Sequence, residues 1–266
     1  MPDEDEVQGF LEQAITAAKM AGALQKERLW GELAISFKGE VDLVTEVDRR
    51  CEELIVACLK GAFPEHSFLA EENSYQSGSL PFRWIVDPLD GTTNYAHGFP
   101  WFCVSIALEH DGKVLLGVIY HCMMDELFTA VRGGGAFLNG KRIHVSNREP
   151  LRKSLLATGF PYDRTRDNEN NFDNFVNFQL ASRAVRRAGA AALDLAYVAA
   201  GRLDGYWECK LKPWDVAAGS LLVVEAGGEV TNHAGLPFSV YDHRILASDG
   251  PIHQEMLEVL NRDGQE

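Results

Sequence analysis

The stretch WIVDPLDGTTNY, from Trp84 to Tyr95, begins with three apolar residues and continues with two carboxylates and a Gly-Thr-Thr triplet. The apolar run is typical of a buried strand. Pro88 has no backbone N–H to donate to a neighbouring strand, so we expect the chain to leave the sheet between Asp87 and Gly91. Asp87 and Asp90 are therefore expected at the edge of a sheet.

The residue types in this stretch suit a cation and a phosphate group. Hard divalent cations such as Mg²⁺ prefer carboxylate oxygens and fill their remaining positions with water or substrate phosphate. Gly91 allows the backbone to approach an anion closely. If a helix begins at Thr92, its free N–H groups would hold phosphate beside the cation. The plainer alternative is a turn before a helix that Thr92 caps.

The composition is that of a soluble, folded protein. The chain has 266 residues, of which 46% are hydrophobic and 24% charged, enough for one large domain or two closely joined lobes. A net charge of -14 disfavours binding to nucleic acid or to an anionic membrane. The acidic N-terminus and the lack of a long apolar run predict a cytoplasmic protein without a membrane span. The five cysteines show no CxxC spacing and are expected to be buried thiols.

Apolar periodicity predicts helices on a largely antiparallel sheet for residues 1–145. Helices are expected over residues 7–30 and from Thr45, whose hydroxyl can cap the second, to residue 63. SFLAEE is expected as a strand that ends in Glu71 and Glu72. Two hairpins follow, with tight turns at Asp111-Gly112 and Asn139-Gly140.

A polar stretch near Ser146 is the expected boundary to a C-terminal α/β lobe over residues 146–266, joined to the first half as a single compact unit. In this half RRAG is expected as a turn. Four helices are also expected: over residues 172–181, from Ala190 onward, over KPWDVAAGSLLVVE up to Gly227-Gly228, and over PIHQEMLEVLNR. Strands are expected at LDGYWE, EVTNHAG and RILASD.

Acidic residues recur at strand ends and helix starts, where side chains are exposed and directed. Consecutive residues of a strand point to opposite sides, so at most one of Glu71 and Glu72 faces any one site. Asp42 and Asp48 could belong only to a capped helix with an acidic first turn, and Asp215 could be only a helix N-cap. The set comprises Asp42, Asp48, Glu71, Asp87, Asp90 and Asp215.

Four blocks in order give the chain a recognisable resemblance: DLVT with Asp48, AEE, WIVDPLDGTTNY, and WDVAAGSLLVVEAGG. In these blocks it resembles the inositol monophosphatase family, a metal-dependent, lithium-sensitive group of sugar-phosphate and nucleotide phosphatases. The resemblance covers about residues 38–260. It implies a layered αβαβα sandwich, usually a homodimer, with Mg²⁺ bound between the lobes.

The resemblance also implies roles for single residues in binding two to three Mg²⁺ ions. The first ion would be held by Glu71, Asp87 and the carbonyl of Leu89, and the second by Asp87, Asp90 and Asp215. A weaker third ion would lean on Glu71 through water. Thr92, oriented by Asp48, would help Glu71 position and deprotonate the attacking water.

Substrate contacts are likewise implied by the resemblance. The N–H groups of Gly91 and Thr92 would hold the phosphate, and Lys38, in the KGxxD segment with Asp42, would rest near it on a flap. Arg186 and Arg187 are an alternative phosphate clamp, but paired arginines before a helix more often belong to a surface or a dimer contact, so they are left outside the site. The sugar ring would contact Asp90, Gly189, Ala190, Ala191, Glu208 and Asp215, with Ala190 standing where Ser or Thr is common.

The function implied is hydrolysis of myo-inositol 1-phosphate, a small phosphorylated polyol, and of related inositol monophosphates. Fructose 1,6-bisphosphate, histidinol phosphate and adenosine 3′,5′-bisphosphate are alternative substrates for the same chemistry. A regulatory or interaction protein that keeps the fold without catalysis is the alternative from another class.

Overall fold

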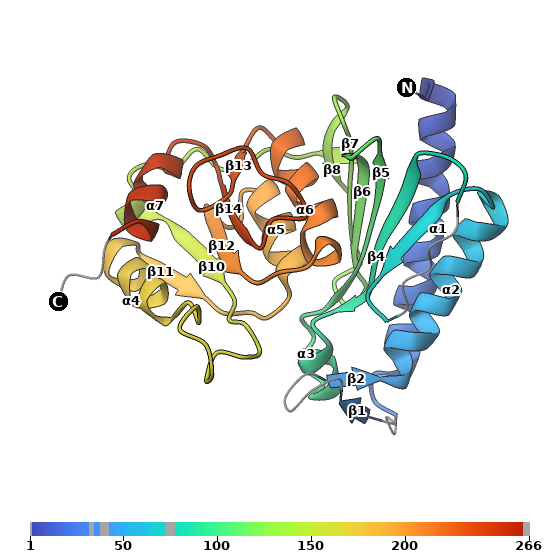
Figure 1. The fold of residues 1–266 in the computed structure, drawn as a ribbon, viewed down its shortest axis with the longest axis horizontal. Coiled ribbons are helices and arrows are strands. Elements are labelled where there is room, and N and C mark those ends of the chain that lie inside the picture. The colour runs from blue at the N-terminus through green and yellow to red at the C-terminus, as the bar shows by residue number, and fades with distance from the viewer. Residues whose placement is uncertain (1, 32–34, 38–42, 73–77, 263–266) are drawn as a thin grey trace.

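Five layers stack in the order helices, sheet, helices, sheet, helices (Figure 1). The computed structural model describes residues 2–31, 35–37, 43–72 and 78–262. This is the αβαβα sandwich that the resemblance implies. Lys38 and Asp42 lie outside the described residues.

The first layer consists of α1 (Glu4–Arg28) and α2 (Glu46–Ala62). As expected, Thr45 caps α2, because its Oγ1 accepts a hydrogen bond from the N–H of Val47 at 3.1 Å. Helix α1 begins before the predicted start, where Asp3 accepts a hydrogen bond from the N–H of Glu6 at 2.8 Å. Within the described ranges, no helix combines the length and apolar content that a bilayer span requires.

The second layer is a seven-stranded sheet in which only the first pair of strands is parallel. Its hairpins turn at Asp111-Gly112 and Asn139-Gly140 as predicted, and all four turn residues have positive φ. In spatial order the strands are β3 (Ser67–Ala70), β4 (Phe82–Asp90), β5 (Cys103–His110), β6 (Lys113–His121), β7 (Glu126–Val131), β8 (Gly135–Leu138) and β9 (Lys141–Arg142). A small antiparallel pair, β1 (Ile35–Phe37) and β2 (Leu43–Thr45), and helix α3 (Thr92–Ala96) lie beside it.

Strand β4 divides its side chains between two cores. Trp84 and Val86 pack in the core under α1 and α2, whereas Ile85 belongs to the core on the opposite face. Because side chains alternate along a strand, Asp87 continues the face of Ile85. The first predicted ligand is therefore directed toward the middle layer.

The chain leaves the sheet between Asp87 and Gly91, as expected, because strand β4 ends at Asp90 and Gly91 is the N-cap of α3. Strand β4 continues to Asp90, which pairs with Cys103, after a register shift between Asp87 and Asp90. This irregularity accommodates Pro88, which needs no ladder hydrogen bond at such a position. The side chain of Asp87 accepts a hydrogen bond from the N–H of Leu89 at 2.9 Å and so stabilises the irregular stretch.

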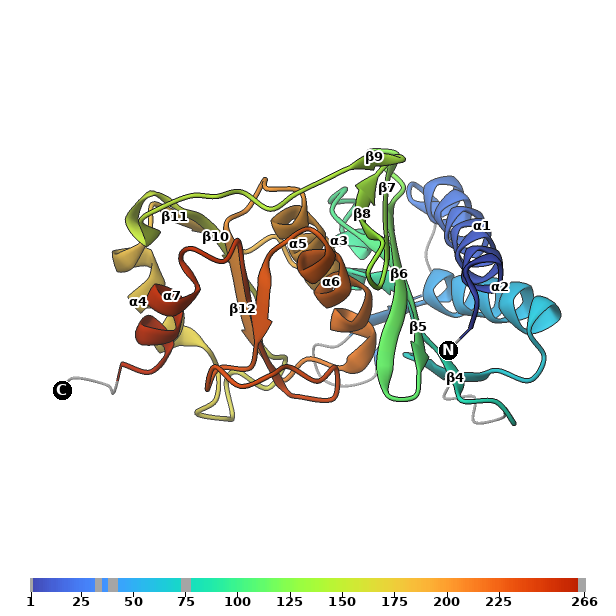
Figure 2. The same cartoon turned by 90° about the horizontal axis from the view of Figure 1, so that it is seen from above.

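The third layer consists of α5 (Ala191–Ala199) and α6 (Pro213–Glu225), which lie between the two sheets (Figure 2). The fourth is a five-stranded mixed sheet ordered β11 (Ala184–Arg186), β10 (Leu155–Thr158), β12 (Gly205–Cys209), β14 (Arg244–Ser248) and β13 (Glu229–Thr231). Outside it lie α4 (Phe172–Ala181), α7 (His253–Leu260) and the 3₁₀ turn η1 (Leu151–Lys153). The predicted elements are present, but part of the predicted RRAG turn is the end of strand β11. The division near Ser146 stays a prediction.

Helix α6 packs very closely on the first sheet. A Cβ atom on Gly117 of β6 would lie 2.9 Å from both the Cα and the carbonyl oxygen of Ala218. Alanines also line much of the middle layer, including Ala192, Ala196 and Ala217. Small side chains on both sides therefore set the short distance between this helix and the sheet.

Candidate active site

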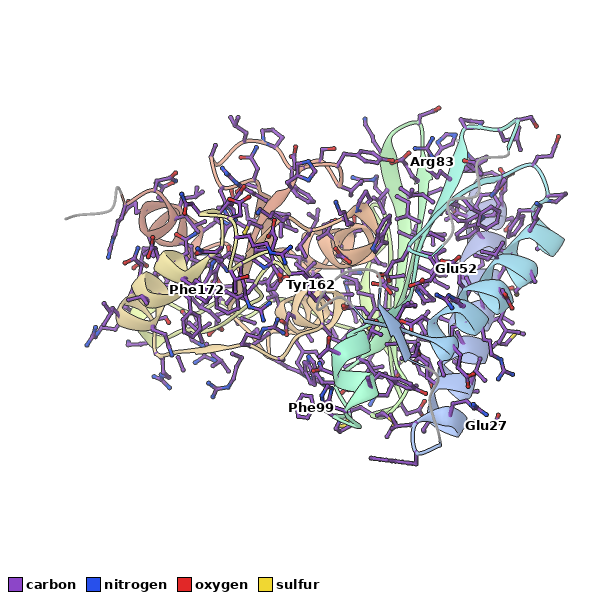
Figure 3. All side chains as sticks on the ribbon, turned by 60° about the horizontal axis from the view of Figure 1, so that its bottom comes forward. Glu27, Glu52, Arg83, Phe99, Tyr162 and Phe172 are labelled. Carbon is purple, nitrogen blue, oxygen red and sulfur yellow. The ribbon has the colours of Figure 1, made fainter. Side chains whose placement is uncertain are left out.

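An acidic cleft of about 790 Å³ lies where the middle helices begin. Its walls come from the end of β4, the start of α3, the loop after β10, the segment before α5, the end of β12 and the start of α6. Tyr162, labelled in Figure 3, lines it from the loop after β10. The cleft is lined by eleven of the predicted site residues: Glu71, Asp87, Leu89, Asp90, Gly91, Thr92, Gly189, Ala190, Ala191, Glu208 and Asp215.

Glu71 follows directly after strand β3, which ends at Ala70 rather than at Glu72 as expected. The N–H of Glu71 donates to the carbonyl of Val86 at 3.2 Å, which places Glu71 beside the residue before Asp87. Glu71 lines the acidic cleft, while the N–H of Glu72 donates to Glu52 of α2 at 2.8 Å. Among these two neighbours only Glu71 lines the cleft, in agreement with the alternation argument.

Gly91 forms the corner between β4 and α3. It has a φ of +93°, and a Cβ atom there would lie 2.9 Å from the carbonyl oxygen of Trp101. Gly91 is the N-cap of α3 and Thr92 is its first residue, so the alternative in which Thr92 caps this helix is wrong. The first N–H groups of a helix have no partner within it, which leaves those of this corner able to bind an anion.

Asp48 lies behind the cleft wall and joins two segments. Its Oδ1 accepts a hydrogen bond from the Oγ1 of Thr92 at 2.9 Å. Its Oδ2 accepts from the N–H of Thr45 at 2.8 Å and from the Oγ1 of Thr45 at 2.5 Å. Asp48 is fully buried, and this burial raises the pKa of its carboxyl group although the three hydrogen bonds lower it. The start of α2 therefore orients Thr92.

Asp90 connects the first sheet to the middle layer. Its Oδ2 accepts a hydrogen bond from the N–H of Ala192, in the first turn of α5, at 2.7 Å. Asn94 of α3 donates to the carbonyls of Ala188 at 2.9 Å and Gly189 at 3.3 Å. These contacts hold the segment before α5 against the β4–α3 corner.

Asp215 lies in the first turn of α6. Its Oδ2 accepts a hydrogen bond from the N–H of Lys212 at 2.6 Å, and Pro213 begins the helix. Lys212, not Asp215, occupies the N-cap position, so the alternative in which Asp215 is only the N-cap is wrong. Burial, together with a smaller contribution from the charge of Asp90, raises the pKa of Asp215 to about 8, although the hydrogen bond from the Lys212 N–H lowers it.

Glu208 stands at the far wall of the cleft, near the end of β12. Its carboxylate accepts a hydrogen bond from the hydroxyl of Tyr206. A Cβ atom on Gly159 would overlap the Glu208 oxygens, so this carboxylate rests directly on the Gly159 backbone. Burial raises the pKa of Glu208 to about 7, while Tyr206 and Arg187 lower it.

The carboxylates of the cleft are costly to ionise without a cation. Burial raises the pKa of Asp87 well above its usual range, and the charges of Glu71 and Asp90 raise it further. Burial also raises the pKa of Asp90 to about 7. A bound cation would lower these pKa values, because it stabilises the ionised form of each acid.

The predicted site residues do not include every residue that lines the cleft, and Arg187 and Asp194 are among those missed from the sequence. Arg187 was left outside the site, yet it lines the cleft, whereas Arg186 does not. Alternation of side chains along a strand is the signal that could have separated them. Asp194 of α5 also lines the cleft, nearly fully buried, and its Oδ1 has no hydrogen-bond partner among the described residues. It lies within an apolar helical pattern that carries no sign of a site.

Comparisons with known proteins agree along nearly the whole chain. A model of the inositol monophosphatase family matches residues 6–265. An inositol-1-monophosphatase from a Synechocystis species is 46% identical over 259 residues, which cover 96% of this chain and 90% of that protein. The Nus factor SuhB of Pseudomonas aeruginosa is 47% identical over 265 residues, 96% of each chain.

Solved structures share the fold. The inositol monophosphatase from Anabaena (Nostoc) superposes with a TM-score of 0.88 at 44% identity, covering 96% of each chain. An IMPase/NADP phosphatase complexed with Mg²⁺ and phosphate superposes with a TM-score of 0.85 at 27% identity, covering 97% of each chain.

Proposed function

Because this chain belongs to the inositol monophosphatase family and is thereby a phosphoric monoester hydrolase, we propose that it hydrolyses myo-inositol 1-phosphate and related inositol monophosphates with Mg²⁺. One observation carries the proposal: four carboxylates from three separate segments line the same cleft as the Gly91-Thr92 corner, namely Glu71 after β3, Asp87 and Asp90 of β4, and Asp215 of α6. Oxygen ligands beside free N–H groups suit a magnesium ion and a phosphate group together.

The donor set fits Mg²⁺, since it offers carboxylate and carbonyl oxygens. Glu71, Asp87 and the Leu89 carbonyl would hold one ion, and Asp87, Asp90 and Asp215 a second; a third would lean on Glu71 through water. Among the described residues, no three His, Cys, Asp or Glu side chains already converge as a complete metal site. Ion binding is therefore expected to draw them together. When bound, Mg²⁺ lowers the pKa of a coordinated water and stabilises charge on the phosphate and the leaving oxygen.

The residues around Thr92 would align the attacking water. The hydroxyl of Thr92 donates to ionised Asp48 at 2.9 Å and lies 3.1 Å from the Leu89 carbonyl; both groups only accept, so the Thr92 oxygen is left to accept from water. Glu71, on the same cleft wall, would take part in positioning this water and receive its proton. Asp48 would act by holding the Thr92 hydroxyl in one orientation beside this water.

Substrate would be held from both sides of the cleft. The N–H groups at Gly91 and Thr92 would bind the phosphate oxygens. Glu208, opposite this corner, would accept hydrogen bonds from ring hydroxyls, and the backbone at Gly189, Ala190 and Ala191 would complete the ring contacts with Asp90 and Asp215. Ala190 has no hydroxyl, so one polar contact common in the family would be missing here.

Further expectations follow from the same resemblance. We expect inhibition by Li⁺, a homodimer and a cytoplasmic location. A Li⁺ titration of the activity tests the inhibition, and light scattering tests the homodimer.

Release of inorganic phosphate from a substrate panel tests the function. The panel contains myo-inositol 1-phosphate, fructose 1,6-bisphosphate, histidinol phosphate and adenosine 3′,5′-bisphosphate, each with Mg²⁺ and after chelation. We expect the highest kcat/KM for inositol 1-phosphate and no turnover without metal. Absence of Mg²⁺-dependent phosphate release from all four compounds would refute the proposed phosphatase activity. A higher kcat/KM for another compound would refute inositol 1-phosphate as the preferred substrate.

The similarity to Nus factor SuhB supports a second candidate, a regulatory role besides catalysis. An inactive variant such as Asp90→Asn separates the two. If this variant restores the phenotype of a strain that lacks the gene, the regulatory role carries the phenotype; if only the wild type restores it, the phosphatase activity does.

A further inference from the structure

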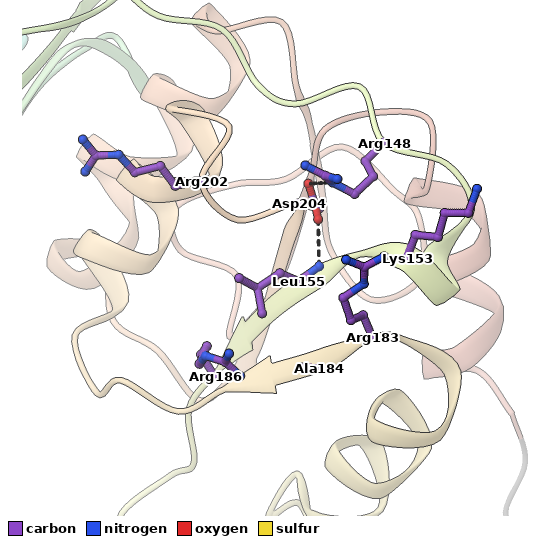
Figure 4. Close-up of a pocket in the computed structure, with 8 residues that line it drawn as sticks. All are labelled: Arg148, Lys153, Leu155, Arg183, Ala184, Arg186, Arg202 and Asp204. Carbon is purple, nitrogen blue, oxygen red and sulfur yellow. Dashed lines mark hydrogen bonds and ion pairs between the residues drawn. The ribbon is translucent and has the colours of Figure 1, made fainter.

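A second, basic cleft of about 320 Å³ lies on the five-stranded sheet, around the first residue of β10 (Figure 4). It presents five cationic side chains and one carboxylate, in a chain whose net charge is -14. The residues that define this basic cleft are Arg148, Lys153, Leu155, Arg183, Ala184, Arg186, Arg202 and Asp204.

The carboxylate of Asp204 cannot neutralise the five cationic side chains of the basic cleft. The Oδ1 of Asp204 accepts hydrogen bonds from Ser146 at 2.6 Å and from the Nε of Arg148 at 3.1 Å, and its Oδ2 accepts from the N–H of Leu155 at 2.7 Å. Figure 4 shows the contacts of Asp204 with Arg148 and Leu155. Asp204 is thus committed to internal contacts and carries one ion pair, with Arg148.

Three cations of the basic cleft remain unopposed. Arg202 binds Glu126 through two nitrogens, at 2.9 and 2.6 Å, and so has its own partner. Lys153, Arg183 and Arg186 form no ion pair with any residue that the structure describes. All three are exposed and able to exchange water for a ligand.

The side chains that line the basic cleft determine which kind of ligand it can bind. Guanidinium groups bind phosphate oxygens in a bidentate manner, and each phosphate group brings one to two negative charges. The volume of about 320 Å³ suits a small molecule. Only Leu155 and Ala184 are apolar, so the cleft offers little to an acidic polypeptide, and the negative net charge opposes a nucleic-acid backbone.

We propose that the basic cleft binds a small compound that carries two or more phosphate groups, at a site separate from the acidic cleft. Two neighbouring arginines at the end of β11 show that the two clefts are separate. Arg186, the last residue of β11, lines the basic cleft, and Arg187 lines the acidic cleft. Consecutive residues of an extended chain point to opposite sides, so the two arginines serve different sites.

Calorimetric titration with inorganic tripolyphosphate tests the proposal. The protein is first stripped of metal and exchanged into metal-free buffer, so that the uncompensated carboxylates of the acidic cleft repel the probe. We expect saturable binding by the wild type. Arg183→Gln/Arg186→Gln should weaken it by about 100-fold, roughly tenfold for each lost charge-assisted contact. Both side chains are exposed, and circular dichroism checks that the variant folds.

Two control variants define the site. Lys19→Gln/Arg152→Gln removes the same charge from exposed positions outside the basic cleft and should change the Kd less than twofold. Arg187→Gln should likewise leave binding unchanged. The proposal is overturned if the wild type does not bind, if the two double variants weaken binding equally, or if Arg187→Gln alone abolishes it.

Light scattering separates a ligand site from a contact between copies of the chain. We expect the same molecular mass for the wild type and for Arg183→Gln/Arg186→Gln. A variant of altered mass, together with no binding of tripolyphosphate by the wild type, would identify the basic cleft as a subunit contact and overturn the proposal. These measurements use metal-free protein, so their outcome does not depend on the proposed phosphatase activity.

Discussion

The hydroxyl of Thr92 donates a hydrogen bond to the carboxylate of Asp48 at 2.9 Å, although 44 residues separate the two. The same carboxylate caps α2 through Thr45. A group proposed to align the attacking water therefore depends on how the start of a distant helix is built.

Asp48→Asn should lower kcat by about 10- to 100-fold with little change in KM, the range for loss of a supporting contact. The amide has one acceptor oxygen, so it cannot serve both Thr45 and Thr92. Thr45→Ala is the matched control: it weakens the cap, costing about 1 kcal/mol of unfolding free energy, but leaves the acceptor for Thr92 intact. Steady-state kinetics and urea denaturation check both. An equal loss of kcat in the two variants would show that only helix stability matters.

Asp90→Asn should reduce turnover by about 100-fold or more while the fold is retained. An amide oxygen can still accept the hydrogen bond from the N–H of Ala192, so the contact with α5 can persist while the negative charge is lost. Circular dichroism and phosphate release with Mg²⁺ measure the two effects. Near-normal turnover would contradict the proposed ligand role of Asp90.

Chelation of metal should stop phosphate release and lower the melting temperature. Bound Mg²⁺ relieves the repulsion among buried carboxylates and, at a concentration 100-fold above its Kd, adds about 2.7 kcal/mol to the free energy of unfolding. Differential scanning calorimetry with and without Mg²⁺ measures this stabilisation. It should be smaller in Asp90→Asn, and equal stabilisation of both proteins would place the ion elsewhere.

Gly159→Ala should raise KM for inositol 1-phosphate, because its Cβ would displace the Glu208 carboxylate that rests on this glycine. Glu208→Gln should have the same effect, a KM increase of about tenfold with kcat changed less, as expected for a contact made equally in the ground and transition states. The Mg²⁺ concentration for half-maximal activity should stay the same in both. A shift in that concentration without a change in KM would move Glu208 out of the substrate site.

His66 should make the fold less stable in mild acid. It stacks between Phe63 and Phe82, and burial lowers its pKa to about 4 from an ordinary value of 6.5. Between these values the unfolded chain binds a proton that the folded chain does not, so the free energy of unfolding falls as pH drops below 6.5.

His66→Phe removes the group that binds this proton in the unfolded chain. The free energy of unfolding should therefore depend less on pH in the variant. Urea denaturation at pH 7.5 and 5.5 should show a loss about 1 kcal/mol smaller for the variant than for the wild type. Equal losses would show that other histidines, such as the half-buried His233, set the slope.

Much of the fold and site could be predicted from short-range patterns. Asp-Gly and Asn-Gly pairs marked the two hairpin turns, and Thr45 marked the start of α2, because these residues act on their own backbone. The bulge at Pro88 and the position of Arg187 depend on pairing with β5 and on the edge strand β11. Such pairings join distant segments, and no local pattern around Asp194 distinguishes a cleft residue from a core one.

The contact of Gly117 with Ala218 fixes more than packing. Asp215 lies three residues before Ala218 on α6, and Asp87 lies on the sheet against which this helix is pressed. With no room for the helix to slide or rise, the spacing between these two acids is set by backbone rather than by side-chain choice. The loop after β10 and the end of β12 belong to the second sheet and not to this helix–sheet contact, so a protein engineer could vary which alcohol is accepted there without disturbing the chemistry of phosphate cleavage.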